Sequence, residues 1–337
     1  MINFFFIFII LNLIIFLNIK KISKFVNIFD VPDKKLKTHK KKTPLIGGTI
    51  ILLNLFLLIA YQIIFLGEFF FLEKEYFKTI DIIGIFILIL SFYLLGLYDD
   101  KYNLNPLKKI FLSIILIFIS ITLNKELIIF NFSLSFYDSR IFLENFSLIF
   151  TIFCFIVLMN SLNFYDGING QSCIYFLVVF SYLLILTKRY EFYGLILIIL
   201  FFLLVLNLKN QLFLGDNGIY VLSIILSIAL IYEHNVYKNI IFADEIFILL
   251  LLPGLELIRL TITRLLKGKN PFYGDKDHIH HLLIKRNSLI KTNLILAIIT
   301  SLPIILFKVL VLNFFLVFIF FLIIYGFIIL KMKKNAS

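Results

Sequence analysis

Apolar runs long enough to cross a lipid bilayer recur along the chain. A transmembrane helix needs about 20 mostly apolar residues, and a soluble domain does not contain a series of such runs. The runs lie at about 2–19, 44–66, 79–98, 109–123, 146–164, 171–187, 190–208, 218–232, 240–258, 292–307 and 309–330. We therefore predict an all-α polytopic integral membrane protein with about 10–11 transmembrane helices, ten being the count if the last two runs form one span.

Composition excludes other classes of protein. Of 337 residues, 61% are hydrophobic and 15% are charged, which rules out a soluble globular fold and intrinsic disorder. The two cysteines both lie in apolar runs, so a disulfide scaffold is excluded as well. The first run is preceded by no Lys or Arg and followed by no small-residue cleavage site, so we interpret it as a membrane helix rather than a secretory signal.

Basic residues are distributed unevenly between the segments that join the runs. With the segment after the first run placed inside, 24 Lys and Arg lie on the inner side and eight on the outer side. This bias predicts an N-terminus outside and a C-terminus inside. It also accounts for the net charge of +12 without a nucleic-acid partner.

The chain is expected to form a single membrane-embedded domain over residues 1–337. Its inner, cytoplasmic loops are predicted at about 20–43, 99–109, 165–171, 209–217 and 259–291. The longest outer segment, 124–145, alternates apolar and polar residues, which is typical of a small hairpin or an interfacial segment.

Carboxylates gather at the predicted inner ends of three successive outside-to-inside helices. These are Asp99 and Asp100, Asp166, and Asp216. Acids at a helix C-terminus face its partial negative charge, and neighbouring carboxylates repel. A cation would relieve both effects, and Mg²⁺ binds one or two carboxylates together with substrate phosphates. Taken singly, each site also suits a solvated loop, a turn or, for Asp216, a helix N-cap.

A second polar cluster lies in the inner segment 259–291. It contains Arg264 and the histidines His278, His280 and His281. We favour a clamp in which Arg, Lys and His donate to phosphate oxygens. A zinc site and a solvated loop are the alternatives.

The first inner segment holds nine lysines, which orient the chain and attract anionic lipids. Lys37 and His39 lie near its end, close to the glycines that begin the second run. Together with the acids and the histidine segment, they place metal-binding and phosphate-binding groups on one membrane face. That combination favours phosphoryl-group transfer to an acceptor carried in the lipid.

Five motifs in order resemble the polyprenyl-phosphate N-acetylhexosamine-1-phosphate transferase family. They are the segment from Asp33 to Gly48, the pair Asp99-Asp100, and the elements 163–170, 215–218 and 271–281. The resemblance covers about residues 30–285. Each motif is short, but five in this order on one face of a polytopic chain are specific.

The resemblance implies a Mg²⁺-dependent enzyme, with Mn²⁺ as an alternative ion. It would move a sugar-1-phosphate from a UDP-sugar to undecaprenyl phosphate and release UMP, starting a lipid-linked glycan of the cell envelope such as an O-antigen. It further implies a bacterial inner-membrane location, a cytoplasmic active site and a homodimer. The partners would be the UDP-sugar, undecaprenyl phosphate and the bilayer.

The family motifs also imply residue roles. Asp216 would be the principal metal ligand, with Asp166 beside it. The implied catalytic residues are Asp99, Asp100, Asp166 and His278. The implied substrate-binding residues are Lys37, His39, Asn163, Asn169, Arg264, His280 and His281. One position departs from the family, because its usual second Asp in the 166–170 element is Asn169 here, which keeps a carbonyl acceptor and loses the charge.

Several alternatives stay open at this stage. The phospho-N-acetylmuramoyl-pentapeptide transferase branch is disfavoured, because the segment after His281 continues Leu282-Leu-Ile-Lys-Arg-Asn. A transporter or flippase would place ionisable residues near the bilayer centre, whereas the acids here cluster at span ends. A catalytically inactive scaffold is a third possibility. Transfer in one step and transfer through an aspartyl-phosphate are not separated by the sequence.

Overall fold

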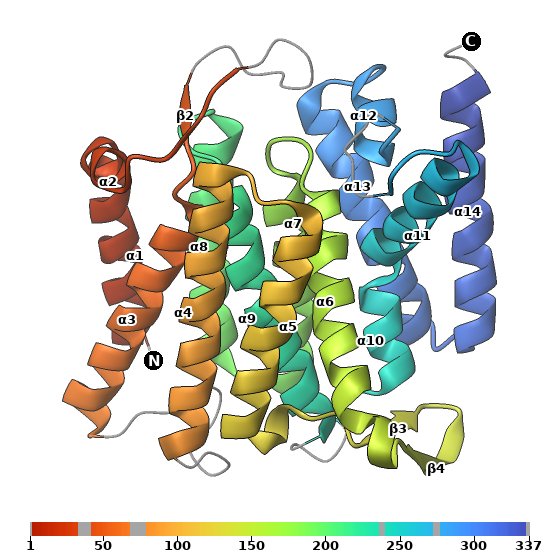
Figure 1. The fold of residues 1–337 in the computed structure, drawn as a ribbon, viewed down its shortest axis with the longest axis horizontal. Helices are drawn as coiled ribbons and strands as arrows, with labels where there is room; N and C mark the ends of the chain where they lie inside the picture. The colour runs from red at the N-terminus through yellow and green to blue at the C-terminus, as the bar shows by residue number, and fades with distance from the viewer. Residues whose placement is uncertain (1, 33–41, 68–78, 236–239, 272–276, 335–337) are drawn as a thin grey trace.

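The computed structural model describes residues 2–32, 42–67, 79–235, 240–271 and 277–334. These residues form a bundle of helices that run between two ends (Figure 1). One end carries β2 (Thr43–Pro44), α12 (Ile279–Ile284) and the C-terminus, and we call it the site end. The opposite end carries the hairpin of β3 (Asn131–Leu134) and β4 (Tyr137–Phe142), and we call it the far end.

Each of the eleven predicted runs contains a helix, so the all-α membrane fold is confirmed. The helices of the runs are α1 (Ile2–Leu17), α3 (Gly47–Leu66), α4 (Thr79–Tyr102), α5 (Pro106–Leu123), α6 (Ser147–Tyr165), α7 (Gln171–Thr187), α8 (Tyr190–Leu208), α9 (Gly215–Asn235), α10 (Ala243–Leu249) with α11 (Leu251–Leu266), α13 (Leu289–Ile304) and α14 (Phe314–Lys334). In the part of the chain that the structure describes, eight helices are long and apolar enough to span a membrane, and two bent pairs raise this to ten. The apolar helix α7 has 17 residues.

Two spans differ from the predicted straight helices. α1 is followed by the short α2 (Ile19–Val26) at an angle of 69°, and α10 meets α11 at the same angle. α11 also continues to Leu266, eight residues past the predicted end, because its charged side chains are paired within the protein. The last two runs form separate helices, joined through a π-helical turn over Ile305–Val309, and each is long enough to span.

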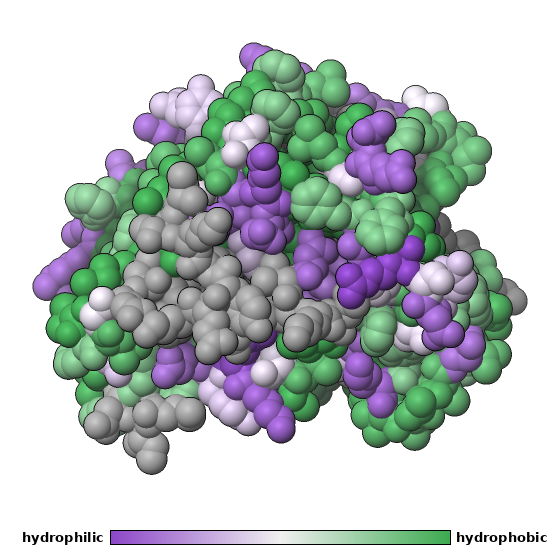
Figure 2. Space-filling model, turned by 90° about the horizontal axis from the view of Figure 1, so that it is seen from below, coloured by the Kyte–Doolittle hydropathy of each residue, from purple (hydrophilic) through white to green (hydrophobic). Residues whose placement is uncertain are grey.

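The hairpin predicted within 124–145 is confirmed. β3 and β4 pair antiparallel, with Phe132 opposite Ile141 and an irregularity before Leu134. Figure 2 views the molecule from this end and shows hydrophilic residues across the middle of the face, with hydrophobic residues around much of its margin. Many of the large exposed side chains elsewhere on the bundle are also apolar, as a lipid-facing surface requires.

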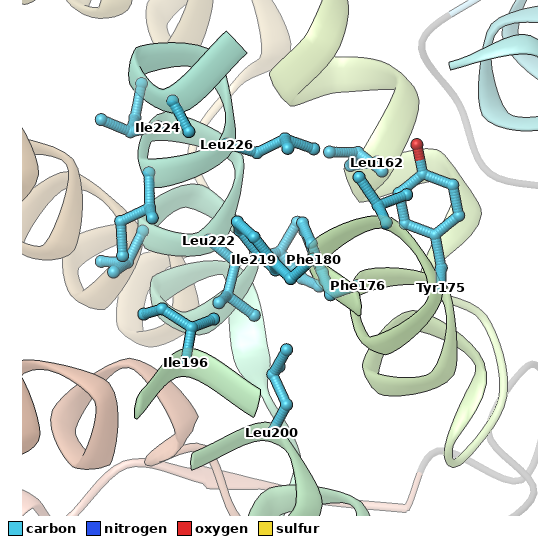
Figure 3. Packing of buried hydrophobic residues seen from close by; sticks show 14 of the residues in the cluster. Leu162, Tyr175, Phe176, Phe180, Ile196, Leu200, Ile219, Leu222, Ile224 and Leu226 are labelled. Atoms are coloured by element: carbon cyan, nitrogen blue, oxygen red, sulfur yellow. The ribbon is translucent and has the colours of Figure 1, made fainter. Parts of the chain in front are cut away.

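The helix α9 lies at the centre of the packed core. Of its membrane-spanning window, 89% is buried inside the protein, compared with 22% for α5 and α14. Figure 3 shows Ile219 and Leu222 of α9 against Phe176 and Phe180 of α7, with Ile196 of α8 close by. The first turn of this buried helix lies at the site end.

A pair of asparagines joins α1 to α3 inside the apolar core. Asn12 Nδ2 donates to Asn54 Oδ1 at 2.8 Å, and Asn54 Nδ2 returns a hydrogen bond to Asn12 Oδ1 at 3.2 Å. Each amide also donates to the carbonyl four residues earlier in its own helix. Both side chains are buried, and such pairs hold membrane helices together where no hydrophobic effect does so.

We predict that Asn54→Ala lowers the free energy of unfolding by about 1–2 kcal/mol, because Asn12 is left with unmatched hydrogen-bonding groups. Denaturation in detergent micelles would measure the change. The double variant Asn12→Leu with Asn54→Leu should recover most of the loss, since no buried amide then remains unpaired. A single variant as stable as the wild type would contradict this role.

Candidate active site

The first turn of α9 is held by a carboxylate from the end of α4. Asp100 Oδ1 accepts from the Asp216 backbone N–H at 2.8 Å, and Asp100 Oδ2 accepts from the Asn217 N–H at 3.0 Å. These N–H groups have no partner within the helix, so Asp100 acts as a helix cap supplied by another helix. The N-cap alternative considered for Asp216 is therefore wrong, because Asp216 lies in the first turn and Asp100 does the capping.

Asp99 points away from its neighbour and is buried, with its side chain 1% exposed. It accepts from the Leu104 N–H at 2.9 Å and from the Tyr220 hydroxyl at 2.9 Å, and it pairs with Lys109. Lys109 also lies 3.4 Å from Asp216 Oδ2. The lysine thus bridges two acids and offsets their repulsion, while the Asp216 side chain stays 26% exposed.

Three of the predicted acids share one cavity of about 600 Å³. Asp100, Asp166 and Asp216 line it, and they come from the ends of three separate helices. The predicted meeting of these carboxylates at one face is confirmed for these three. The other lining residues are Phe29, Asp30, Val31, Leu45, Lys101, Asn103, Asn163, Gly167, Ile168, Asn169, Asn207, Phe213, Leu214, Gly215 and His281.

The loop 166–170 closes one wall of this cavity. Ser172 Oγ donates to Asp166 Oδ1 at 2.6 Å, and the Gly170 N–H donates to Asn207 Oδ1 at 2.5 Å. Burial raises the pKa of Asp166 to about 6, while the hydrogen bond from Ser172 lowers it. Asn169 Nδ2 donates to Asn210 Oδ1 at 2.7 Å, so the residue that departs from the family pattern is tied to the neighbouring loop by an amide pair.

Of the three histidines, His281 is the one that the structure places in the cavity lining. His281 lines the cavity, as predicted. His280 is buried against Gly167, whose α-carbon lies so close to the imidazole that a Cβ atom there would overlap it. Burial, followed by the neighbouring His281 and His278 and by Arg259, lowers the pKa of His280 well below its usual value. His280 is not among the residues that line the cavity, so this geometry gives no support to its predicted contact with substrate.

His278 and Arg264 lie behind the cavity wall rather than on it. Arg264 donates to the Pro271 carbonyl at 2.8 Å, its Nη2 lies 3.3 Å from His278 Nε2, and its guanidinium stacks over Phe164. Neither side chain is among the residues that line the cavity. Their contacts hold the segment that leads to α12. This geometry does not support the direct contact with substrate that we predicted for both residues.

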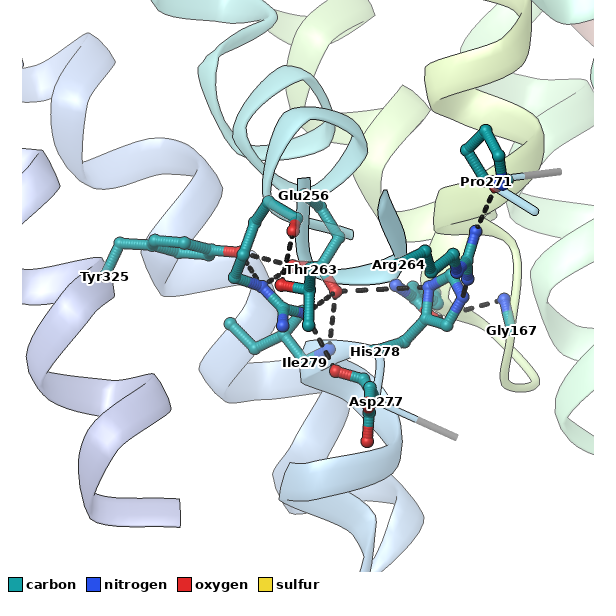
Figure 4. A network of polar contacts seen from close by, with 11 residues as sticks. Gly167, Glu256, Thr263, Arg264, Pro271, Asp277, His278, Ile279 and Tyr325 are labelled. Atoms are coloured by element: carbon teal, nitrogen blue, oxygen red, sulfur yellow. Dashed lines mark hydrogen bonds and ion pairs between the residues drawn. The ribbon is translucent and has the colours of Figure 1, made fainter. Parts of the chain in front are cut away.

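A buried carboxylate, Glu256 of α11, organises this region (Figure 4). It accepts from the Ile279 N–H at 2.6 Å, from Arg259 Nη2 at 2.8 Å and from the Tyr325 hydroxyl. Arg259 in turn donates to the Asp277 carbonyl at 2.8 Å. Glu256 thereby fixes the start of α12, the helix that carries His280 and His281.

Sequence reasoning missed Glu256, Asn217 and Lys109 as site residues. Glu256 and Arg259 lie three residues apart at the end of an apolar run. On a helix this spacing allows an ion pair, so the pair could have been predicted. Lys109 follows Asp100 by nine residues, and in the sequence it contributed only to the count of basic residues that predicts the membrane orientation. Lys37, His39 and the stretch 272–276 lie outside the described residues.

The model of glycosyl transferase family 4 matches residues 82–234. That segment runs from α4 to the end of α9 and holds every carboxylate of the cavity apart from Asp30. This stretch of the chain is similar to glycosyl transferase family 4. No curated protein matches the chain.

This similarity supports, in general terms, a transferase that moves a sugar phosphate to a polyprenyl phosphate. Enzymes of this family are generally Mg²⁺-dependent. The match ends before Glu256 and the histidine segment. The matched region therefore contains Asp100, Asp166 and Asp216, while the regions outside it add Phe29, Asp30, Leu45 and His281 to the cavity.

We predict that Glu256→Ala lowers the free energy of unfolding by about 3 kcal/mol, because Arg259 and the Ile279 N–H lose a buried partner. Thermal denaturation in detergent would measure it. Lys267→Ala serves as the control, since Lys267 pairs with Asp277 at 3.0 Å on the surface and its removal should change stability by less than about 0.5 kcal/mol. Equal effects of the two substitutions would contradict the role given to Glu256.

Proposed function

We propose that the chain transfers N-acetylhexosamine-1-phosphate from a UDP-sugar to undecaprenyl phosphate and releases UMP. The observation that carries the proposal is the cavity at the site end, where Asp100, Asp166 and Asp216 share one lining with His281. Carboxylates that can hold a divalent cation, set beside basic side chains, suit phosphoryl transfer. A site at the end of a lipid-embedded bundle suits an acceptor carried in the bilayer.

The size and lining of the cavity support a nucleotide-sugar donor. About 600 Å³ lies within the usual range for small-molecule sites. The amides of Asn163 and Asn169 offer hydrogen bonds to a base or a sugar, and Phe29 and Phe213 offer apolar rings for a base to pack on.

The residues present fit Mg²⁺ bound together with substrate. Asp216 and Asp166 would hold it, since both line the cavity and Mg²⁺ takes one or two carboxylates plus substrate phosphates and waters. Among the described residues, no three His, Cys, Asp or Glu side chains converge into a complete protein cage. When bound, the ion would neutralise charge on the diphosphate. Mn²⁺ suits the same oxygen ligands.

In the proposed reaction, a phosphate oxygen of the lipid attacks the phosphorus that bears the sugar. The bond from this phosphorus to the oxygen it shares with the uridine phosphate breaks, and that oxygen leaves with UMP. A lipid phosphate that arrives protonated gives its proton to a carboxylate. Asp100 lines the cavity and Asp99 does not, so we assign this contact to Asp100.

The proposed setting is the bacterial inner membrane, with the site end in the cytoplasm, where UDP-sugars are made. The bias of basic residues toward the segments of the site end supports this orientation. The product would start a lipid-linked envelope glycan. A homodimer and the choice of an N-acetylhexosamine as the sugar follow from the family resemblance alone and stay predictions.

We predict metal-dependent and lipid-dependent UMP release from at least one UDP-N-acetylhexosamine, assayed in detergent with undecaprenyl phosphate and MgCl₂. EDTA should abolish it. Asp216→Asn should lower kcat at least about 100-fold, because it removes the charge that would hold the cation. Asp138→Asn, on the exposed far-end strand β4, is the matched control and should turn over normally. Wild-type turnover in Asp216→Asn would exclude Asp216 from the reaction.

We also predict that the site end is cytoplasmic. In intact spheroplasts, a membrane-impermeant maleimide should label a cysteine at Asp138→Cys but should label Lys21→Cys only after permeabilisation. Both positions are exposed, so access to the reagent is set by the membrane. Labelling of Lys21→Cys from outside would reverse the proposed orientation.

A further inference from the structure

Asn217 is a fully buried amide in the first turn of α9, and its side chain joins three parts of the protein. Its Nδ2 donates to Asp100 Oδ2 at 2.5 Å and to the Leu45 carbonyl at 3.1 Å. Its Oδ1 accepts from the Gly48 N–H at 2.7 Å. Both amide hydrogens and the amide oxygen are therefore used, each toward a different group.

The three helices that meet at this amide leave no room for adjustment. Gly96 of α4 packs on the backbone of Asn217 so closely that a Cβ atom there would overlap it. On the other side, the Phe213 N–H donates to the Pro44 carbonyl at 2.9 Å, which holds the chain before α9 beside β2. Asn217 thus lies where α3, α4 and α9 touch, directly behind the cavity.

We propose that Asn217 is the positioning residue of the acid cluster. Its amide holds the carboxylate of Asp100 on the first turn of α9, and through that carboxylate it sets the direction in which Asp216 faces the cavity. The role given to Asp216 rests on the proposed function, whereas the placement of Asp100 rests on the contacts themselves.

The hydrogen bonds indicate why a neutral amide is needed here. Asp100 accepts two backbone N–H groups of α9 and one N–H of Asn217, and Asp216 follows immediately on the same turn. Three N–H donors offset part of the cost of burying this carboxylate beside another acid. A side chain that could only accept hydrogen bonds would repel Asp100. An apolar side chain would remove the hydrogen bonds that Asn217 makes with the Asp100 carboxylate, the Gly48 N–H and the Leu45 carbonyl.

The same amide connects the acids to another residue of the cavity lining. Leu45, whose carbonyl accepts from Asn217, lines the cavity together with Asp100 and Asp216. Displacement of the amide would therefore shift both the carboxylates and the part of the lining at Leu45. Misplacement by about 1 Å can lower the rate of a positioned reaction about 100-fold.

The decisive experiment measures backbone hydrogen exchange in the absence of substrate. Asn217→Ala should speed exchange of the Asp216 and Asn217 amides about 10-fold, because the carboxylate that accepts from them is no longer held. Asn54→Ala is the matched control, because it also removes a fully buried asparagine between helices but lies away from the cavity. It should leave exchange at these two amides unchanged. Unchanged exchange in Asn217→Ala would overturn the proposal, whatever the enzyme does.

Kinetics and metal binding provide the second readout. At matched stability, Asn217→Ala should lower kcat about 10–100-fold with a smaller change in KM, and it should weaken Mn²⁺ binding followed by electron paramagnetic resonance. Asn54→Ala should change neither. Combination with Asp100→Asn should be strongly non-additive, because Asn217 acts through Asp100. Additive losses would overturn the proposal.

If Asn217→Ala does not fold, Asn217→Asp provides the test. It keeps the size of the side chain and an acceptor for Gly48, but it loses the donors and adds a charge beside Asp100. The same increase in amide exchange is expected, and its absence would overturn the proposal. If the wild type releases no UMP from any donor, the proposed function fails, while the exchange experiment still decides the role of Asn217.

Discussion

The carboxylate of Asp100 accepts the first free N–H groups of α9, and the arrangement of the site end depends on that contact. A helix that is almost wholly enclosed cannot use water to satisfy its first turn, so another part of the chain must supply the acceptor. Because the acceptor comes from α4, the ends of α4 and α9 are held together. Asp216 is brought to the cavity as a result, and Lys109 can then lie between Asp216 and Asp99.

Hydropathy predicted the helices well because bilayer thickness fixes their length and lipid requires an apolar surface. It did not predict the 69° break at Leu250, because the run 240–258 stays apolar across the break. It also did not predict that α11 continues to Leu266. That extension depends on Glu256, Arg259 and Tyr325 satisfying one another, and such a contact between separate helices leaves no periodic signal in one sequence.

The site was predictable where residue type alone decides the chemistry. Acids at the ends of successive helices had to meet at one face, and Asp100, Asp166 and Asp216 do so. The histidine segment was harder, because the charge of an imidazole depends on burial. His280 packs on Gly167, and burial lowers its pKa, whereas His281, one residue later, reaches the cavity. Lys37 and His39 remain predictions, since they lie outside the described residues.

The paired amides of Asn12 and Asn54 have a consequence for how the protein is assembled. α1 precedes α3 in the chain, so during synthesis α1 enters the bilayer before its partner exists. Until then Asn12 has only the carbonyl of Phe8 in its own helix as a partner, and its amide oxygen faces hydrocarbon. The apolar residues that make up the rest of α1 must outweigh that penalty for the helix to stay inserted. When α3 enters the bilayer, Asn54 pairs with Asn12 and removes this penalty. The docking of α3 on α1 is therefore an early step in the assembly of the bundle.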